Sequence, residues 1–433
     1  MNVKVQNFLR LSGIPALILL VAINAVPQIP PPERVKIFGK VWDTINRKYY
    51  DPNFNGVNWT AARERYLPRV ETAKDDAEFY SLVKQMVGEL GDAHTNFLTP
   101  KEAAARKSRQ SVGVGLWIGE AEGKPVVFGV KADSEAARAG IVPGMILTAV
   151  DGRNAREVLA EKRAAIKSSS ANAVNRFAYA RLLSGAENTP VVLGFLDLNN
   201  QVKEVTLFRR ANNNFNFSAS ELVSRRLPSN IGYIRFDEFK SSFLKPYKKA
   251  LIELKDTKGL IIDLRFNAGG EAYAMEEIAE RFFSEKVSFG KAKTRTGKMP
   301  KFLGISLVPK ELFVGDDDMH LYSAPVVVLI SSYSASASEH FAVGMQESGR
   351  AKIVGSQSCG CLLGIIGKTK IEGAELYLSQ IDFISAQGKR IEGVGVTPDL
   401  PVAPTVADAA DNFSAAVREA EKLLTSLSAA QSN

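Results

Sequence analysis

Apolar runs that lead through a turn of small residues into a helical stretch constrain the fold of this chain most. Gly259–Leu264 is soon followed by Asn-Ala-Gly-Gly, and Pro325–Ile330 runs into a turn of mostly serine and alanine. Ile231–Phe236 is a third apolar run. Strands that are apolar on both faces are typical of a buried sheet covered by helices. The alternation of strands and helices over residues 216–405 therefore predicts an α/β core.

The amino terminus has the pattern of an export signal. Lys4 and Arg10 precede the apolar run Ile14–Ile23, and small residues follow up to Ala25, an order typical of a secretory signal peptide. The run is shorter than the ~20 residues that cross a bilayer. We therefore predict a signal over residues 1–25, cleaved after Ala25, and an exported protein in a periplasmic or other extracytoplasmic compartment. In the alternative, the segment stays as an anchor, and only then do we expect contact with a membrane.

The rest of the chain outside the core divides by pattern. We predict a stiff proline-rich spacer over residues 26–35, a helical segment over 36–100 and a terminal helix over 406–433. In the helical segment, apolar residues recur at three- and four-residue steps, as one face of an amphipathic helix requires; they are Phe79, Leu82, Val83, Met86, Val87 and Leu90. Residues 284–322 carry several lysines and then three aspartates, which indicates a solvated insertion or flap.

Composition and motifs argue against several classes of function. In 433 residues, 55 Lys+Arg against 47 Asp+Glu give a net charge of +8 with no dense basic block, so we expect no nucleic-acid partner. Common zinc, nucleotide and dinucleotide motifs are missing from the sequence, and we expect no metal and no cofactor. Cys359 and Cys361 are too close in sequence for an unstrained bridge. The pair could bind a metal or respond to oxidation, but it offers two ligands where zinc takes four.

Residues 101–215 resemble a PDZ domain. The segment SEAARAGIVPGMILTAVDG (134–152) carries the resemblance, although Met145 stands where the pattern usually has aspartate. The resemblance implies that a glycine loop and the strand after it hold the carboxyl-terminal tail of a peptide as an added strand. The residues implied are Gly113, Val114, Gly115, Leu116, Trp117 and Ile118. In the alternative, this domain is a spacer that binds no peptide.

The most informative segment for chemistry follows the apolar run that ends at Ile330. Its small residues allow a tight turn that exposes a hydroxyl at the start of a helix, where unpaired amides and the helix dipole favour negative charge. Ser336 is therefore a candidate nucleophile. Ser336 and Glu339 also fit a capping box, so this serine could be only a helix cap.

The Gly-Gly turn could complete the chemistry of acyl transfer. A developing oxyanion needs two amide donors, one from a glycine turn and one from the residue after the nucleophile. The candidates are Gly269, or its neighbour Gly270, and Ala337. Taken alone, the glycine pair is also consistent with a plain strand-to-helix turn.

The motifs in this order resemble the carboxyl-terminal processing, or tail-specific, serine peptidase family. The matching pieces are GDAHTNFL (91–98), the PDZ-like stretch, GLIIDLRFNAGG (259–270), PVVVLISSYSASASE (325–339), ESGRAKIVG (347–355) and EGVGVTPDLPV (392–402). The resemblance implies an α/β fold with a Clp-protease/crotonase-like spiral core, an inserted PDZ-like β domain and an N-terminal helical segment. It also implies that Ser336 is the nucleophile and that cleavage occurs near protein carboxyl termini.

The general base departs from the usual family pattern. Bacterial members carry a lysine 25 residues after the serine, and Cys361 occupies that position here. A branch resembling the tricorn core peptidase uses histidine and glutamate instead, and its pattern falls on His94 and Glu392, with Ala93 in place of a supporting serine. Histidine titrates near neutrality and can take the serine proton. We therefore predict His94 as the base and Glu392 as the residue that orients it.

Other side chains remain as alternative bases. His320 and His340 lie outside the matched motifs, and we expect the His340 side chain to point along its helix rather than back to the turn. Lys368 and Lys370 lie in a stretch that reads as an exposed turn.

These patterns predict an exported serine endopeptidase that acts by an acyl-enzyme mechanism without a cofactor. Its expected partners are protein or peptide substrates with accessible carboxyl termini. The alternative is a catalytically inactive, peptide-binding scaffold derived from such a peptidase, because Cys361 and Ala93 depart from the family pattern.

Overall fold

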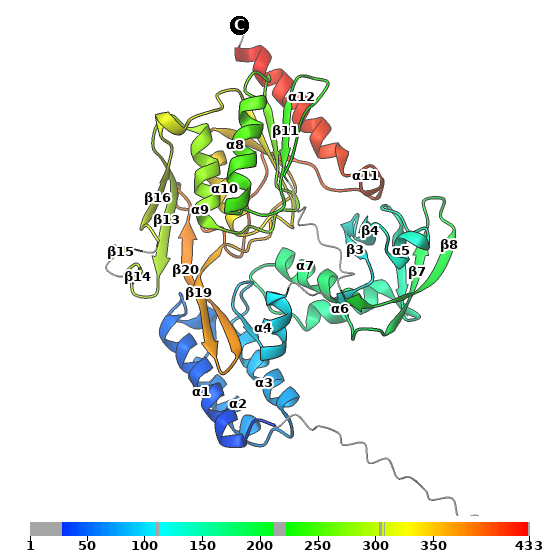
Figure 1. Ribbon diagram of the computed structural model, residues 1–433, viewed down its shortest axis with the longest axis vertical. Helices are drawn as coiled ribbons and strands as arrows, with labels where there is room; N and C mark the ends of the chain where they lie inside the picture. The colour runs from blue at the N-terminus through cyan, green and yellow to red at the C-terminus, as the bar shows by residue number, and fades with distance from the viewer. Residues whose placement is uncertain (1–27, 109–111, 212–221, 303–304, 307, 432–433) are drawn as a thin grey trace, which may run out of the picture.

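The computed structural model describes residues 28–108, 112–211, 222–302, 305–306 and 308–431. The predicted signal and the start of the predicted spacer lie outside the described residues. An N-terminal helical part, a β-rich part and an α/β core follow one another along the chain, and the C-terminal helix returns to the core (Figure 1). We call the β-rich part PDZ-like after the resemblance of its sequence. Among the described residues, no helix combines the length and apolar character that crossing a bilayer requires.

The core is a six-stranded sheet between layers of helices. Its strands lie in the order β10, β11, β12, β17, β18 and β21, and all run parallel except β10. They are β10 (Val223–Arg226), β11 (Gly232–Arg235), β12 (Leu260–Asp263), β17 (Val326–Ile330), β18 (Ala351–Gly355) and β21 (Leu400–Pro401). Helices α8 (Leu244–Glu253), α9 (Ala272–Ala279) and α10 (Ala337–Glu347) cover one face, and α12 (Ser414–Gln431) covers the other. The predicted α/β class is confirmed.

The predicted single helix over residues 406–433 is wrong. The structure has a short helix α11 (Val406–Ala410) before α12. Asn412 and Phe413, between the two helices, have φ of +50° and +57°, a conformation that a right-handed helix does not allow. The break lets the Phe413 ring pack edge-on against Phe128 and Phe266, with centroids 4.8 and 5.1 Å away.

A second, antiparallel sheet lies beside the core and includes two strands of the expected insertion. Its strands are β1 (Asn96–Leu98), β20 (Ala374–Ile384), β13 (Val287–Thr294) and β16 (Glu311–Val314) in that order, with β19 (Leu363–Ile371) also paired to β20. Residues 284–322 are therefore not simply a solvated flap, because Phe289 on β13 is fully buried in the core. The lysines at 286, 291, 293, 298 and 301 are exposed, as predicted. A short strand pair, β14 (Lys301–Phe302) and β15 (Ile305–Ser306), extends from this region.

The N-terminal part consists of α1 (Pro31–Lys48), α2 (Trp59–Glu71), α3 (Asp76–Gly88) and α4 (Pro100–Lys107). The predicted apolar face of α3 is confirmed as buried. The extended spacer is wrong from residue 31 onward, because Pro31 and Pro32 form the first turn of α1, where a missing N–H costs no helical hydrogen bond. The β19–β20 hairpin inserts among these helices and shares their core (Figure 1).

The PDZ-like part has a β sheet with the strand order β3, β4, β5, β7, β8, and β6 pairs with β5. The strands are β3 (Leu116–Ala121), β4 (Lys124–Val130), β5 (Ile146–Val150), β6 (Arg153–Asn154), β7 (Pro190–Leu196) and β8 (Val202–Phe208), and the helices are α5 (Glu135–Arg138), α6 (Ala155–Ala164) and α7 (Ala171–Leu182). β2 (Val112–Gly113) pairs separately with β9 (Arg210–Ala211). β3 starts at Leu116, directly after Gly115, which has a φ of +78°.

Candidate active site

The candidate nucleophile lies in the turn between β17 and α10. Ser336 precedes α10 with φ of +57° and ψ of −121°, a conformation that non-glycine residues rarely adopt and that is often found at functional sites. Its amide donates to the Cys361 carbonyl oxygen at 2.9 Å. Ser334 and Ser338 donate their hydroxyls to carbonyl oxygens of Leu264 and Asn267, at 2.8 and 2.9 Å. These serines therefore build the turn, whereas Ser336 lines a cavity.

Glu339 holds this turn from one helical turn further along. Its buried carboxylate accepts four hydrogen bonds, from the amides of Ser336 (3.1 Å), Gly360 (2.7 Å) and Cys361 (2.8 Å) and from the Ser358 hydroxyl (2.6 Å). Burial raises its pKa, and these donors oppose the rise. The capping contact of Glu339 with the Ser336 amide is present, and the same carboxylate joins the nucleophile turn to residues 358–361.

One cavity of about 480 Å³ is lined by both Ser336 and His94. Its other walls are largely apolar and include Met275, Ala292, Leu312, Leu362, Leu363, Ile365, Ile381 and Phe383. Gly270, Ala337 and His340 also line it. The fold thus brings the predicted nucleophile and the predicted base, far apart in sequence, to the walls of one cavity.

His94 lies in a short loop that is held by Asp92. One oxygen of the Asp92 carboxylate accepts the amides of His94 and Thr95 at 2.9 and 2.6 Å, and the other accepts the Tyr49 hydroxyl at 2.9 Å. The ring nitrogen Nδ1 of His94 is buried and has no hydrogen-bond partner. Burial lowers the His94 pKa, Asp92 opposes this and the positive charge of Arg176 adds to it. The imidazole is therefore neutral at neutral pH, which is the form that can accept a proton.

Glu392 lies near this loop but does not bond the buried ring nitrogen of His94. It is 4% exposed, and its Oε2 accepts the Leu362 amide at 2.6 Å. Burial raises the Glu392 pKa to about 8; a hydrogen bond with Ser169 lowers it, and the charge of Asp92 raises it further. Glu392 therefore makes no hydrogen bond to Nδ1 of His94, and its orienting role stays a prediction.

The expected oxyanion donors lie around Ser336, but Gly270 is better placed than Gly269. A Cβ atom at Gly269 would be 2.7 Å from the Cβ of Ser336, so this position requires glycine. The amide of Gly269 is already bonded to the side chain of Asn267 at 2.9 Å. Gly270 lines the cavity instead, and its amide has no acceptor within the described part of the chain. Ala337 supplies the second amide, because the first amides of a helix have no partner within the helix.

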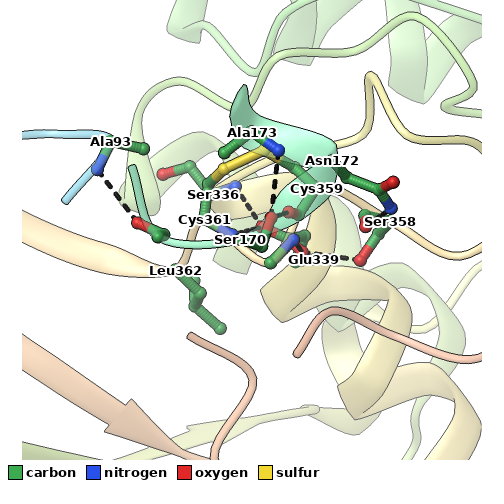
Figure 2. The surroundings of a disulfide bond; sticks show 12 residues. Ala93, Ser170, Asn172, Ala173, Ser336, Glu339, Ser358, Cys359, Cys361 and Leu362 are labelled. Atoms are coloured by element: carbon green, nitrogen blue, oxygen red, sulfur yellow. Dashed lines mark hydrogen bonds between the residues drawn. A yellow bond between two sulfur atoms is a disulfide. The ribbon is translucent and has the colours of Figure 1, made fainter. Parts of the chain in front are cut away.

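The position of the usual lysine is occupied by a disulfide. Cys359 and Cys361 are bonded to each other, with their Cα atoms 5.3 Å apart (Figure 2). Gly360, with φ of +71°, lets the chain turn so that both sulfurs meet. The bonded pair is buried against Ala173 of α7 and Ala335. Its sulfurs are thus not free thiols, and in the described residues no group of three metal-ligating side chains is found.

The alternative bases are placed less favourably. His340 lines the cavity, but its Nε2 bonds the Phe289 carbonyl oxygen at 2.9 Å, and burial lowers its pKa to about 4. His320 contacts the Tyr322 carbonyl oxygen at 3.2 Å and is not part of the cavity lining. Lys368 and Lys370 are exposed as expected, although they lie within strand β19 rather than in a turn. Lys368 forms an ion pair with Glu375.

The residues predicted to bind a peptide are mostly inside the PDZ-like part. Val114, Leu116 and Ile118 are buried in its apolar core, and Gly113 pairs with Arg210. Trp117 points to the core domain, with ring centroids 5.0 Å from both Phe266 and Tyr333. β3 is nevertheless the outermost strand of its sheet, so the backbone edge, rather than these side chains, could accept an added strand.

Sequence reasoning did not predict some residues of the site. Asp92 stood within a matched motif, but its contacts depend on Tyr49 and Ser379, which belong to other segments. Ser169 and Arg176 come from the PDZ-like part and carried no local signal. Only packing of that part against the core brings them to the site.

Comparisons with known proteins show which proteins this chain is similar to. The family model described as peptidase family S41 matches residues 230–402, and that of the tricorn protease C1 domain matches residues 30–88. The carboxyl-terminal-processing protease of Synechocystis sp. is 25% identical over 376 residues, which cover 85% of this chain and 80% of that protein. Carboxyl-terminal-processing peptidase 2, chloroplastic, of Arabidopsis thaliana is 27% identical, with 93% and 76% covered.

Solved structures share the fold at low sequence identity. A photosystem II D1 C-terminal processing protease has a TM-score of 0.57 and 23% identity, covering 87% of this chain and 96% of that one. Mature CPAF has a TM-score of 0.71 and 14% identity, covering 93% and 99%. The matched models and the curated relatives thus show that this chain is similar to peptidase family S41 over residues 230–402 and to carboxyl-terminal-processing proteases along most of its length.

Proposed function

We propose that this chain is an exported serine endopeptidase in which Ser336 is the nucleophile and His94 the general base. The observation that carries the proposal is that both residues line one cavity of about 480 Å³. Two amides, those of Gly270 and Ala337, border the same space without a described acceptor. This combination meets the needs of acyl transfer: a hydroxyl, a neutral imidazole and oxyanion donors.

In the proposed reaction, His94 takes the proton of the Ser336 hydroxyl while Oγ bonds to the scissile carbonyl carbon. The carbonyl oxygen becomes an oxyanion that the amides of Gly270 and Ala337 stabilise. His94 returns the proton to the leaving amine as the C–N bond breaks, which leaves an acyl-enzyme that water hydrolyses. The apolar walls of the cavity suit an apolar substrate side chain next to the scissile bond.

The proposed substrates are proteins whose carboxyl-terminal tails are accessible. An extended tail could add to β3, the outermost strand of the PDZ-like sheet. Because Trp117 of β3 contacts Tyr333, three residues before the nucleophile, a tail on β3 would lie close to the site. Export rests on the amino-terminal sequence pattern.

Two measurements test the assignment. A fluorophosphonate probe should label the wild type and not Ser336→Ala, and equal labelling would refute the nucleophile. Cleavage of an unfolded protein should be reduced by at least ~100-fold in His94→Ala and unchanged in Lys368→Ala. Loss only in Lys368→Ala would instead assign the base to the lysine.

A second candidate function is a peptide-binding scaffold without turnover. It is favoured by one observation: a disulfide stands where the usual family pattern has a lysine. Absence of cleavage in every version of the chain, together with retained binding of carboxyl-terminal peptides, would support it.

A further inference from the structure

Ser169 joins two segments that the proposed mechanism needs. It lies just before α7, in the PDZ-like part, whereas His94 comes from the N-terminal part and Glu392 from the core. Its hydroxyl oxygen accepts the amide of Ala93 at 2.9 Å, the residue next to His94. The same hydroxyl lies beside the Glu392 carboxylate, where it lowers the pKa of that carboxyl. Residue 93 is an alanine, so this position has no side-chain hydroxyl and can bond Glu392 and the residues around it only through its backbone.

The contacts continue from Glu392 to the nucleophile. Oε2 of Glu392 accepts the amide of Leu362 at 2.6 Å. The preceding residue, Cys361, accepts the Ser336 amide at 2.9 Å (Figure 2). The Ser169 side chain thus lies between the His94 loop and Glu392, and hydrogen bonds through residues 361 and 362 link Glu392 to Ser336.

The neighbours of Ser169 strengthen its position. The Ser170 hydroxyl donates to the Cys359 carbonyl oxygen and accepts the Ala173 amide at 3.0 Å, as the cap of α7. The Asn172 side chain donates to the Ser358 carbonyl oxygen at 2.9 Å (Figure 2). These bonds hold the start of α7 against the turn that contains the Cys359–Cys361 disulfide, which we call the disulfide turn. Ser169 therefore has little freedom to move away.

We propose that Ser169 is a positioning residue of the active site, which ties the His94 loop to the Glu392 carboxylate and so sets the imidazole relative to Ser336. This inference rests on the proposed peptidase function. The PDZ-like part then contributes to the active site, because its Ser169 hydroxyl lies between the His94 loop and the Glu392 carboxylate.

The charges around the site define a second consequence. Glu392 faces the negative Asp92 and the positive Arg390, and His94 faces Asp92 and Arg176. The hydroxyl of Ser169 and the amide of Leu362 stabilise the ionised carboxylate, so loss of the hydroxyl must raise the Glu392 pKa further above its usual range. If ionised Glu392 stabilises the imidazolium formed in the reaction, the acidic limb of the activity profile must move to higher pH.

The test uses the full chain with three variants and a quenched peptide substrate. Ser169→Ala removes the bridge, Ser169→Thr keeps a hydroxyl, and Ser168→Ala is the matched control, because the Ser168 hydroxyl is buried without a partner. We expect Ser169→Ala to lower kcat by ~10- to 100-fold with little change in KM, since small errors in position cost rates of this size. Its acidic limb should shift upward, Ser169→Thr should recover most of kcat, and Ser168→Ala should match the wild type.

A double-mutant cycle with Glu392→Gln separates positioning from folding. If Ser169 acts through Glu392, its removal should cost much less in the Glu392→Gln background. The inference is overturned if Ser169→Ala matches Ser168→Ala, or if its loss of kcat follows the unfolded fraction with an unchanged pH profile and no recovery in Ser169→Thr. A wild type whose turnover does not depend on Ser336 overturns the proposed function, and this inference with it.

Discussion

At the scale of single residues, burial decides which groups can do chemistry. His94 and His340 both have lowered pKa values because they are buried, but the carbonyl oxygen of Phe289 occupies one ring nitrogen of His340. His94 keeps a ring in the cavity whose Nδ1 is unpaired. A buried polar atom without a partner is costly, and such costs are often retained for function. This contrast favours His94 as the base.

Glu392 gives a prediction on stability. Its pKa is raised to about 8 in the folded protein, so the folded state keeps a proton that the unfolded state has released. The stability this group contributes is therefore present below its unfolded pKa and is lost as pH rises through about 8. Glu392→Gln removes this dependence, so its stability relative to the wild type should grow with pH by at most about 1.4 kcal/mol per unit.

Urea unfolding at pH 5 and pH 8 measures this effect, and the pH 5 value serves as the internal control. The same difference between variant and wild type at both pH values would show that Glu392 is ionised in the folded protein at pH 5.

At the scale of elements, the disulfide turn is the link between the start of α7 and the nucleophile. The carbonyl of Cys359 accepts from Ser170, and the carbonyl of Cys361 accepts from Ser336. The amides of Gly360 and Cys361 are bound by Glu339. The backbone of this turn bonds Ser170, Ser336 and Glu339 at once, so the turn must keep one conformation. The disulfide restricts the alternative conformations.

The bridge closes a very small loop, so its effect on global stability should be modest. We expect Cys359→Ala with Cys361→Ala to lower the free energy of unfolding by about 1.5 kcal/mol, from the loop-closure relation. Urea unfolding measures the change, and a dithiol reductant should destabilise the wild type but not the double variant. If the reductant affects both proteins equally, the bridge is not the source of the effect.

At the scale of the whole molecule, the site depends on contacts among all three parts. The β19–β20 hairpin belongs to the sequence of the core but packs among the N-terminal helices. On β20, the Ser379 hydroxyl donates to Asp92 at 2.8 Å, and Asp92 holds the His94 amide. The helical part and the hairpin therefore position the base together.

Packing of this hairpin can be tested at Leu376, which is fully buried in the shared core. Leu376→Ala should lower the free energy of unfolding by about 2–5 kcal/mol, the usual cost of emptying a buried leucine site. Lys370→Ala, on the exposed side of the hairpin, should change it by less than ~0.5 kcal/mol. Chemical denaturation compares the two, and equal effects would mean that the hairpin is not anchored in this core.

The α/β class and the positions of Ser336 and His94 could be predicted because their signals are local. An apolar run followed by small residues specifies a buried strand and a tight turn wherever it occurs, and GDAHT is a contiguous motif. The strands β11, β12 and β17 and the buried face of α3 followed from the same kind of pattern.

Contacts between distant segments were decided by the tertiary structure alone. The disulfide between Cys359 and Cys361 forms because the chain turns at Gly360. Gly270 is favoured over Gly269 because the amide of Gly269 already donates to the side chain of Asn267. Ser169 has no motif, because its role exists only where three parts of the chain meet. Periodicity and motifs report what a segment does with its neighbours in sequence, whereas hydrogen bonds across the fold depend on packing that no single segment encodes.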